Sequence, residues 1–202
     1  MSHILSPSTI SSFAIGVVCA GIIGLIISPT SSPHQATHGQ PYVHVHADFA
    51  MILDHELVDF TDDRYQSHAD AVKHPSLHLH NNDGHIIHRH AEGVTLGDFF
   101  SSLGFSISDT LIITDAGGEY RATDHERVLF FVNGHQKTGI ADYVIADEDQ
   151  LLIYFGDPSD DRITTYLANL TDEACIYSGT CPDRGIAPSS DCGITCDVFD
   201  AQ

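Results

Sequence analysis

The stretch VHVHADFAMIL (Val43–Leu53) decides the fold, because its side chains fall into two sets with a period of two. Successive residues of a β-strand point to opposite faces of the sheet, so this period predicts a strand. One face carries only apolar side chains: Val43, Val45, Ala47, Phe49, Met51 and Leu53. The other face begins with His44, His46 and Asp48. We therefore expect one face buried in a core and a polar patch on the opposite face.

A second alternating stretch, SLHLHNNDGHIIHRH (Ser76–His90), carries a turn sequence in its middle and predicts a β-hairpin. A three-residue loop at Asn82–Gly84, with Gly84 in the left-handed conformation, places His78 opposite His88. Directly opposed residues share a face, so this register brings four histidines together. They are His78, His80, His88 and His90. A two-residue loop at Asp83 and Gly84 would instead put the two pairs on opposite faces.

The elements that follow the hairpin complete a small α+β fold. Thr95–Leu103 has an N-capping threonine and an apolar stripe at helical spacing, and predicts a helix that ends at Gly104. Three apolar stretches then predict strands at Thr110–Thr114, Arg127–Val132 and Gln150–Phe155. Strands, one crossing helix and further strands are typical of an α+β domain, which we place at residues 42–156.

The N-terminal segment indicates a membrane anchor. Ile10–Ile27 contains no charged side chain and is near the minimum length for a membrane-spanning helix. We expect a short tail at residues 1–9, a transmembrane anchor at 10–28, a flexible Pro- and Ser-rich linker at 29–41, and the bulk of the chain outside the cytoplasm. A cleaved signal peptide is the alternative for the apolar segment.

Four of the five cysteines cluster in the C-terminal part, residues 157–202, which we expect to be a short disulfide-bonded tail. They are Cys175, Cys181, Cys192 and Cys196. An even number of clustered cysteines in an exported protein predicts two disulfides, with three connectivities open. A four-thiolate zinc site is the alternative, but the paired C-x-x-C spacing of such sites does not occur.

The charge of the chain restricts its partners. With 28 acidic and 8 basic residues, the net charge is −20, which excludes a protein that holds nucleic-acid phosphates. Acidic residues are spread along the chain, as in proteins that stay soluble in salty surroundings, where ions screen their repulsion. We therefore assign the charge to the environment of the protein and look elsewhere for its function.

The 15 histidines are the functional signal. Residues two apart on a strand are roughly 6.6 Å apart on one face, so both imidazoles of an H-x-H pair can approach one metal ion. We predict a Zn or Cu site, since both metals accept neutral imidazole. The expected ligands are His44, His46, Asp48, His78, His80, His88 and His90. A solvated polar face without metal is the simpler alternative.

A metal site on strands predicts sequestration or delivery of the ion, with the metal and the membrane as partners. The first alternative is a metal-dependent hydrolase or redox enzyme that uses the same histidines, although no H-E-x-x-H or G-x-S-x-G motif is present. The second is an adhesion or ligand-binding module without metal.

Two parts of the sequence resemble known families. VNGHQKTGIADYVIADEDQLLIYFG (Val132–Gly156) resembles the closing part of β-grasp domains of the transcobalamin-C-terminal-like and soluble-ligand-binding type, which implies a β-grasp-like mixed sheet. The motifs at His44–Phe49, His78–Phe100 and Ala174–Pro182 are similar to those of a family of membrane-anchored, exported, His-rich prokaryotic proteins. Disulfide isomerase activity is assigned to some of its members, but the present chain lacks the C-x-x-C motif of that activity.

Overall fold

The computed structural model describes residues 42–189. The predicted anchor at 10–28, the linker at 29–41 and both Cys192 and Cys196 lie outside the described residues. Among residues 42–189, no helix has the length and apolar character needed to cross a bilayer.

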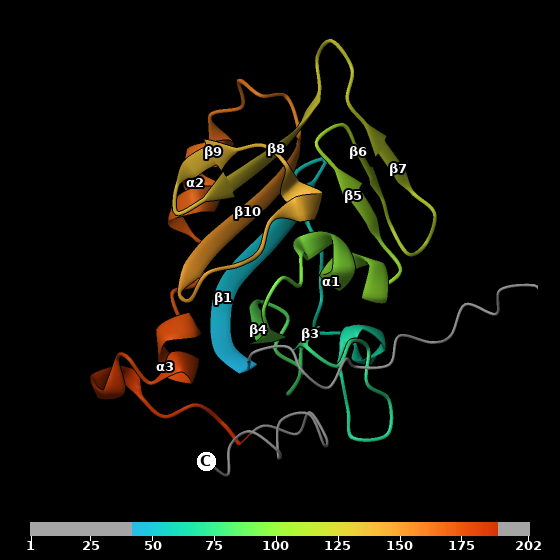
Figure 1. The fold of residues 1–202 in the computed structure, drawn as a ribbon. Coiled ribbons are helices and arrows are strands. Elements are labelled where there is room, and N and C mark those ends of the chain that lie inside the picture. The colour runs from blue at the N-terminus through green and yellow to red at the C-terminus, as the bar shows by residue number, and fades with distance from the viewer. Residues whose placement is uncertain (1–41, 190–202) are drawn as a thin grey trace, which may run out of the picture. The chain divides into compact units, whose positions relative to one another are not determined.

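The fold is built around a mixed sheet with two parallel strands at its centre, β1 (Tyr42–Leu53) and β10 (Asp149–Gly156) (Figure 1). The antiparallel strands of this sheet are β2 (Glu56–Leu57), β3 (Leu77–His78), β4 (Ile86–Ala91), β8 (Arg127–Val132) and β9 (His135–Lys137). Their order is β3-β4-β1-β10-β8-β9, and β2 pairs with one end of β1. A separate small sheet consists of β5 (Ser106–Ser108), β6 (Leu111–Ile113) and β7 (Glu119–Arg121). Together with short helices, these sheets confirm the predicted α+β class.

The main core lies on the face of the sheet that the alternation in β1 predicts. Phe49, Met51 and Leu53 are buried there against the helix α1 (Leu96–Ser102). The side chain of Thr95 accepts a hydrogen bond from the Asp98 amide, and the Asp98 carboxylate accepts one from the Thr95 amide. This capping box satisfies amides that the first helical turn leaves open, and it confirms the predicted start of the helix.

The opposite face of the sheet is covered by two helices that lie in the predicted tail. α2 (Arg162–Ala168) packs over Ile52 and Leu152 in a second, smaller core. α3 (Ala174–Ser178) follows and contacts β1 (Figure 1). The sequence contains a signal for the first helix, because apolar residues recur there at helical spacing: Ile163, Tyr166, Leu167 and Leu170.

The register of the predicted hairpin is confirmed, but its turn differs from the prediction. His78 pairs with His88, as the three-residue loop requires. The left-handed residues are Asn81 and Asn82, whereas Gly84 is not left-handed. Gly84 is required for another reason: a Cβ at this position would lie 2.7 Å from a backbone nitrogen of the loop that follows β2.

Candidate metal centre

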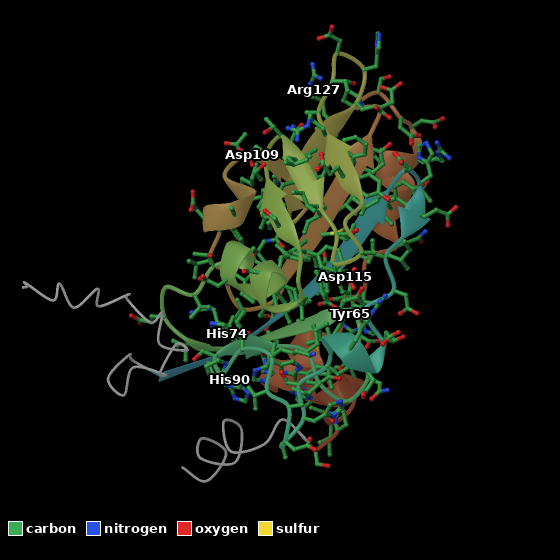
Figure 2. All side chains as sticks on the ribbon, turned by 90° about the vertical axis from the view of Figure 1, so that its right-hand side faces the viewer. Tyr65, His74, His90, Asp109, Asp115 and Arg127 are labelled. Atoms are coloured by element: carbon green, nitrogen blue, oxygen red, sulfur yellow. A yellow bond between two sulfur atoms is a disulfide. The ribbon has the colours of Figure 1, made fainter. Side chains whose placement is uncertain are left out.

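Six histidines lie together on the sheet face that α3 covers. The pairing of β1, β4 and β3 places His46, His88 and His78 side by side in one row across the sheet. Since side chains two residues apart share a face, His90 extends the patch along β4, and His80 follows β3. The register of β1 shifts between Tyr42 and Val45, and the His44 ring in this segment contacts the rings of His46 and His90. We call these six residues the histidine cluster. Figure 2 shows His90 at the end of the domain opposite Arg127.

The six rings form a closed circuit of close contacts. From His44 to His46 the ring centroids are 4.6 Å apart, and from His46 to His88 they are 4.7 Å apart. The circuit continues through His80 at 3.8 Å, then His78 at 5.8 Å, then His90 at 5.1 Å, and it returns to His44 at 5.1 Å. The sequence prediction that three H-x-H pairs meet on one face is thus realised by the hairpin register.

The cluster is buried rather than solvated. Five of its six residues have exposed fractions of 5% or less: His46, His78, His80, His88 and His90. His44 is exposed and lies at the open edge of the cluster. The alternative of a solvated histidine face is therefore wrong. The sequence left it open because alternation along a strand separates two faces but does not determine which of them is covered.

Burial keeps these rings neutral. Removal from water lowers the pKa of His46 to about 3, of His78 to about 4 and of His90 to about 2, and it holds the pKa of His88 well below the usual 6.5. Repulsion between neighbouring imidazoles acts in the same direction in all four. Neutral imidazole is the form that binds transition metals.

Hydrogen bonds outside the cluster determine which nitrogen of two rings carries the proton. Ser178 donates its only hydroxyl proton to Asp147, so the 2.8 Å contact between Ser178 Oγ and His46 Nδ1 requires a proton on that nitrogen. His78 Nδ1 lies 3.0 Å from the carbonyl oxygen of His74, which can only accept. Both rings therefore carry the lone pair on Nε2, as in metal sites where a second contact fixes the ring. Sequence reasoning missed Ser178 and Asp147.

The Nε2 atom of His88, between these two rings, is buried without a hydrogen-bond partner in the described part of the chain. Burial of such a group without compensation costs about 1–3 kcal/mol. The ring of Tyr177 on α3 packs edge-on against the His88 ring, with centroids 5.1 Å apart.

Asp48 has a different role from the predicted one. Its carboxylate is buried and accepts hydrogen bonds from the amides of Glu173 at 2.9 Å and Ala174 at 3.0 Å. These are amides at the start of α3, so Asp48 anchors this helix over the sheet. We therefore do not include Asp48 among the proposed metal ligands.

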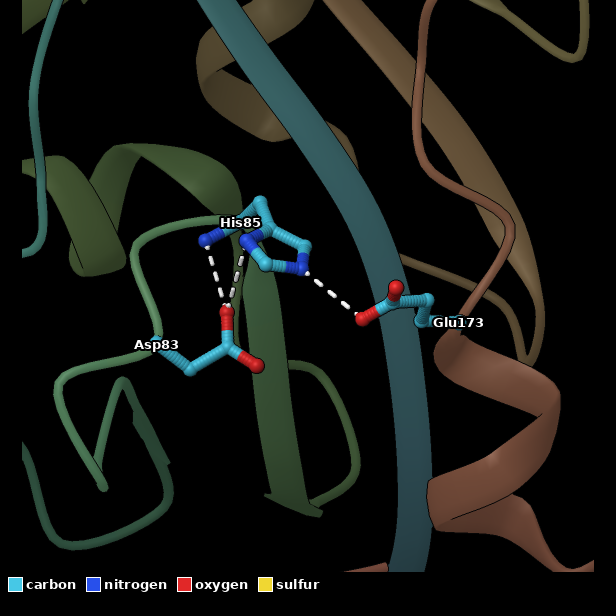
Figure 3. Close-up of side chains that lie close together, drawn as sticks. All are labelled: Asp83, His85 and Glu173. Atoms are coloured by element: carbon cyan, nitrogen blue, oxygen red, sulfur yellow. Dashed lines mark hydrogen bonds and ion pairs between the residues drawn. The ribbon is translucent and has the colours of Figure 1, made fainter. Parts of the chain in front are cut away.

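A second group of ionisable side chains connects the hairpin turn to the start of α3 (Figure 3). The group consists of Asp83, His85 and Glu173. Within residues 42–189, these are the three side chains whose potential ligand atoms all lie within 4.8 Å of one another. However, Asp83 contacts Nδ1 of His85 at 3.0 Å, whereas Glu173 contacts Nε2 at 3.1 Å. The carboxylates thus contact opposite nitrogens of the ring, and we interpret the group as two ion pairs with one imidazole rather than as a metal site.

This group is a charged triad. The hydrogen bond to Asp83 is the main cause that raises the pKa of His85 to about 9, so its ring is an imidazolium at neutral pH. Burial acts to raise the pKa of Asp83, but hydrogen bonds from His85 and Tyr177 outweigh it and lower this pKa. The triad thus holds α3 against the hairpin turn, and sequence reasoning did not predict it.

The cysteine prediction is confirmed in part. Cys175 and Cys181 form a disulfide, with Cα atoms 5.5 Å apart. This bond closes the segment that begins in α3 and carries Tyr177 and Ser178 over the histidine cluster. Comparisons of the chain with protein-family models, with curated proteins and with solved structures gave no match.

Proposed function

We propose that this protein binds a transition metal ion, Zn or Cu, in the histidine cluster, for sequestration or delivery outside the cytoplasm. The observation that carries the proposal is the row His46–His88–His78. Two of its rings hold the lone pair on Nε2, and the third has a buried Nε2 without a partner within residues 42–189. A metal ion would bind all three nitrogens and would give the buried Nε2 of His88 its partner.

The spacing of the rings suits a shared ion for one of the two neighbouring pairs in this row. Two imidazoles that bind one tetrahedral ion at about 2.0–2.1 Å have ring centroids about 5 Å apart. The centroids of His46 and His88 are 4.7 Å apart, and those of His78 and His88 are 6.3 Å apart. Binding of one ion by all three rings therefore requires His78 to move closer to the other two. At 3.8 Å from His88, His80 is too close to serve as a further ligand of the same tetrahedral ion without moving.

The proposal also includes a β-grasp-like topology and a location outside the cytoplasm. Strand order supports a β-grasp-like domain: β4 and β8 flank the parallel pair β1 and β10, and α1 crosses the core face. The Cys175–Cys181 disulfide supports an oxidising compartment, as expected for a chain held outside the cytoplasm by an anchor at residues 10–28.

The test is the metal content of the chain, expressed without a His-tag and measured by mass spectrometry after purification and incubation with Zn or Cu. The informative variant is His88→Leu, which keeps the volume of the side chain and removes the central ligand. We expect this variant to remain folded and to lose most of the bound metal. The matched control is His125→Leu, at an exposed histidine outside the cluster, and it should bind metal like the wild type. Equal metal in both variants, or none in the wild type, would contradict the proposal.

A further inference from the structure

A cavity of about 470 Å³ lies on the same side of the sheet as the histidine cluster, beyond Asp48 along β1. It lies beside the part of β1 between Asp48, which pairs with the first residue of β4, and Ile52, which pairs with β2. The segment between α2 and α3 forms another wall. The walls are mainly apolar: Ala50, Ile52, Leu57, Leu152, Tyr166 and Leu170. This volume is in the range of small-molecule sites, which are usually apolar with a few polar groups.

One polar group in the wall lacks a partner among the described residues. The hydroxyl of Thr171 is buried and makes no hydrogen bond to any part of residues 42–189. A buried hydroxyl normally finds a partner, because leaving it without one costs about 1–3 kcal/mol. Since the hydroxyl has less than 1 Å² of accessible surface, a ligand with one hydrogen-bonding group would become its partner through a rotation of the Thr171 side chain toward the cavity.

The charge around the cavity selects against anions. His85 lines the wall as an imidazolium, but Asp83 and Glu173 occupy both of its nitrogens, so this triad is net negative. Asp59 adds an exposed carboxylate at the rim, and the chain as a whole carries −20. An anionic ligand such as a fatty acid would meet repulsion here, and the described residues that line the cavity include no Lys or Arg to bind it.

We propose that this cavity is a second site, independent of the histidine cluster, for a small uncharged molecule that is mostly apolar and carries one hydrogen-bonding group. The apolar walls bind the body of the ligand, and the Thr171 hydroxyl orients its polar group.

The test uses two photoactivatable probes with the same benzophenone core, the neutral 4-benzoylbenzyl alcohol and the anionic 4-benzoylbenzoate. The full chain is irradiated with each probe, and the labelled peptides are identified by mass spectrometry. We expect saturable labelling by the alcohol of the peptides that contain Leu57 or Leu170, and at least fivefold less labelling by the carboxylate. Equal labelling by both probes, or no saturation with the alcohol, would overturn the proposal.

Variants separate binding from folding. Ala50→Leu fills the cavity and should reduce labelling by the alcohol at least fivefold, whereas Ala168→Leu, on an exposed part of α2 outside the cavity, should not. Thr171→Val keeps the shape of the side chain and removes only the hydroxyl, so the fold is preserved even if Ala50→Leu does not fold. This substitution should weaken the binding of the alcohol probe about threefold to tenfold. Unchanged labelling in Thr171→Val would contradict the role of the hydroxyl.

Discussion

Acid should unfold the metal-free protein in the range where histidine titrates, because the cluster is buried in its neutral form. In the unfolded chain each histidine has a pKa of about 6.5. In the folded chain the pKa is about 3 for His46, about 4 for His78 and about 2 for His90, and that of His88 is also far below 6.5. Below pH 6.5 the unfolded state therefore binds more protons, and the free energy of unfolding falls as the pH falls.

The magnitude follows from proton linkage. One pH unit below 6.5 costs about 1.4 kcal/mol for each ring that stays neutral in the folded state. At pH 5 the four rings together cost about 8 kcal/mol, which is comparable with the whole stability of a domain, about 5–15 kcal/mol. Carboxylates with a lowered pKa, such as that of Asp83, lose their contribution to stability only below about pH 4. The effect of histidine protonation can therefore be separated from that of carboxylate protonation.

The assay is urea unfolding of chelator-treated protein between pH 7.5 and 4.5, followed by far-ultraviolet circular dichroism. We expect a steep loss of stability below pH 6.5, with a slope of about four protons, and a slope smaller by about one proton in His88→Leu. The exposed His125→Leu should leave the slope unchanged. A metal-free protein that is equally stable at pH 7 and pH 5 would refute the argument that these rings are held neutral by burial.

Other predictions concern the residues around the cluster. Asp48→Asn weakens the anchor of α3 and should cost about 2 kcal/mol of unfolding free energy in urea titrations. Ser178→Ala removes the acceptor of the His46 proton, and competition with a chelator should show about tenfold weaker metal binding. Gly84→Ala places a Cβ against backbone and should lower the thermal unfolding temperature by an amount equivalent to about 1–3 kcal/mol. The raised pKa of His85 means that its stabilisation is complete below pH 6.5 and is lost as the pH rises through about 9, so His85→Gln should flatten the stability profile between pH 7 and 10.

The sequence predicts the parts of the site that depend on short-range geometry. Alternation determines the two faces of β1. The turn sequence limits the hairpin to two registers, and the one with a three-residue loop pairs His78 with His88, as observed. The register depends on the number of residues between the strands, so it is correct even though the left-handed residues are Asn81 and Asn82 instead of Gly84. Local pattern is sufficient where neighbours in space are also neighbours along the chain.

The parts that could not be predicted depend on contacts between distant segments. Asp48 accepts hydrogen bonds from amides 125 and 126 residues away, and Ser178 contacts His46 across 132 residues. No periodicity along the chain records such a contact. For the same reason the burial of the cluster could not be predicted, because the element that covers it is the segment we expected to be a disulfide-bonded tail.

The order of side chains along one face of β1 explains how the two proposed sites can coexist on it. From its N-terminal end this face carries imidazoles at His44 and His46, a carboxylate at Asp48, and then apolar side chains at Ala50 and Ile52. Asp48 binds the start of α3, and the helix extends from there over the imidazoles. The apolar side chains of Ala50 and Ile52 instead pack with residues of α2 and line the cavity. The net charge of −20 then acts on both sites in the same sense, because it attracts cations to the exposed edge at His44 and repels anions from the cavity. The same charge therefore favours the cation that we propose for the histidine cluster and disfavours anions at the proposed cavity site.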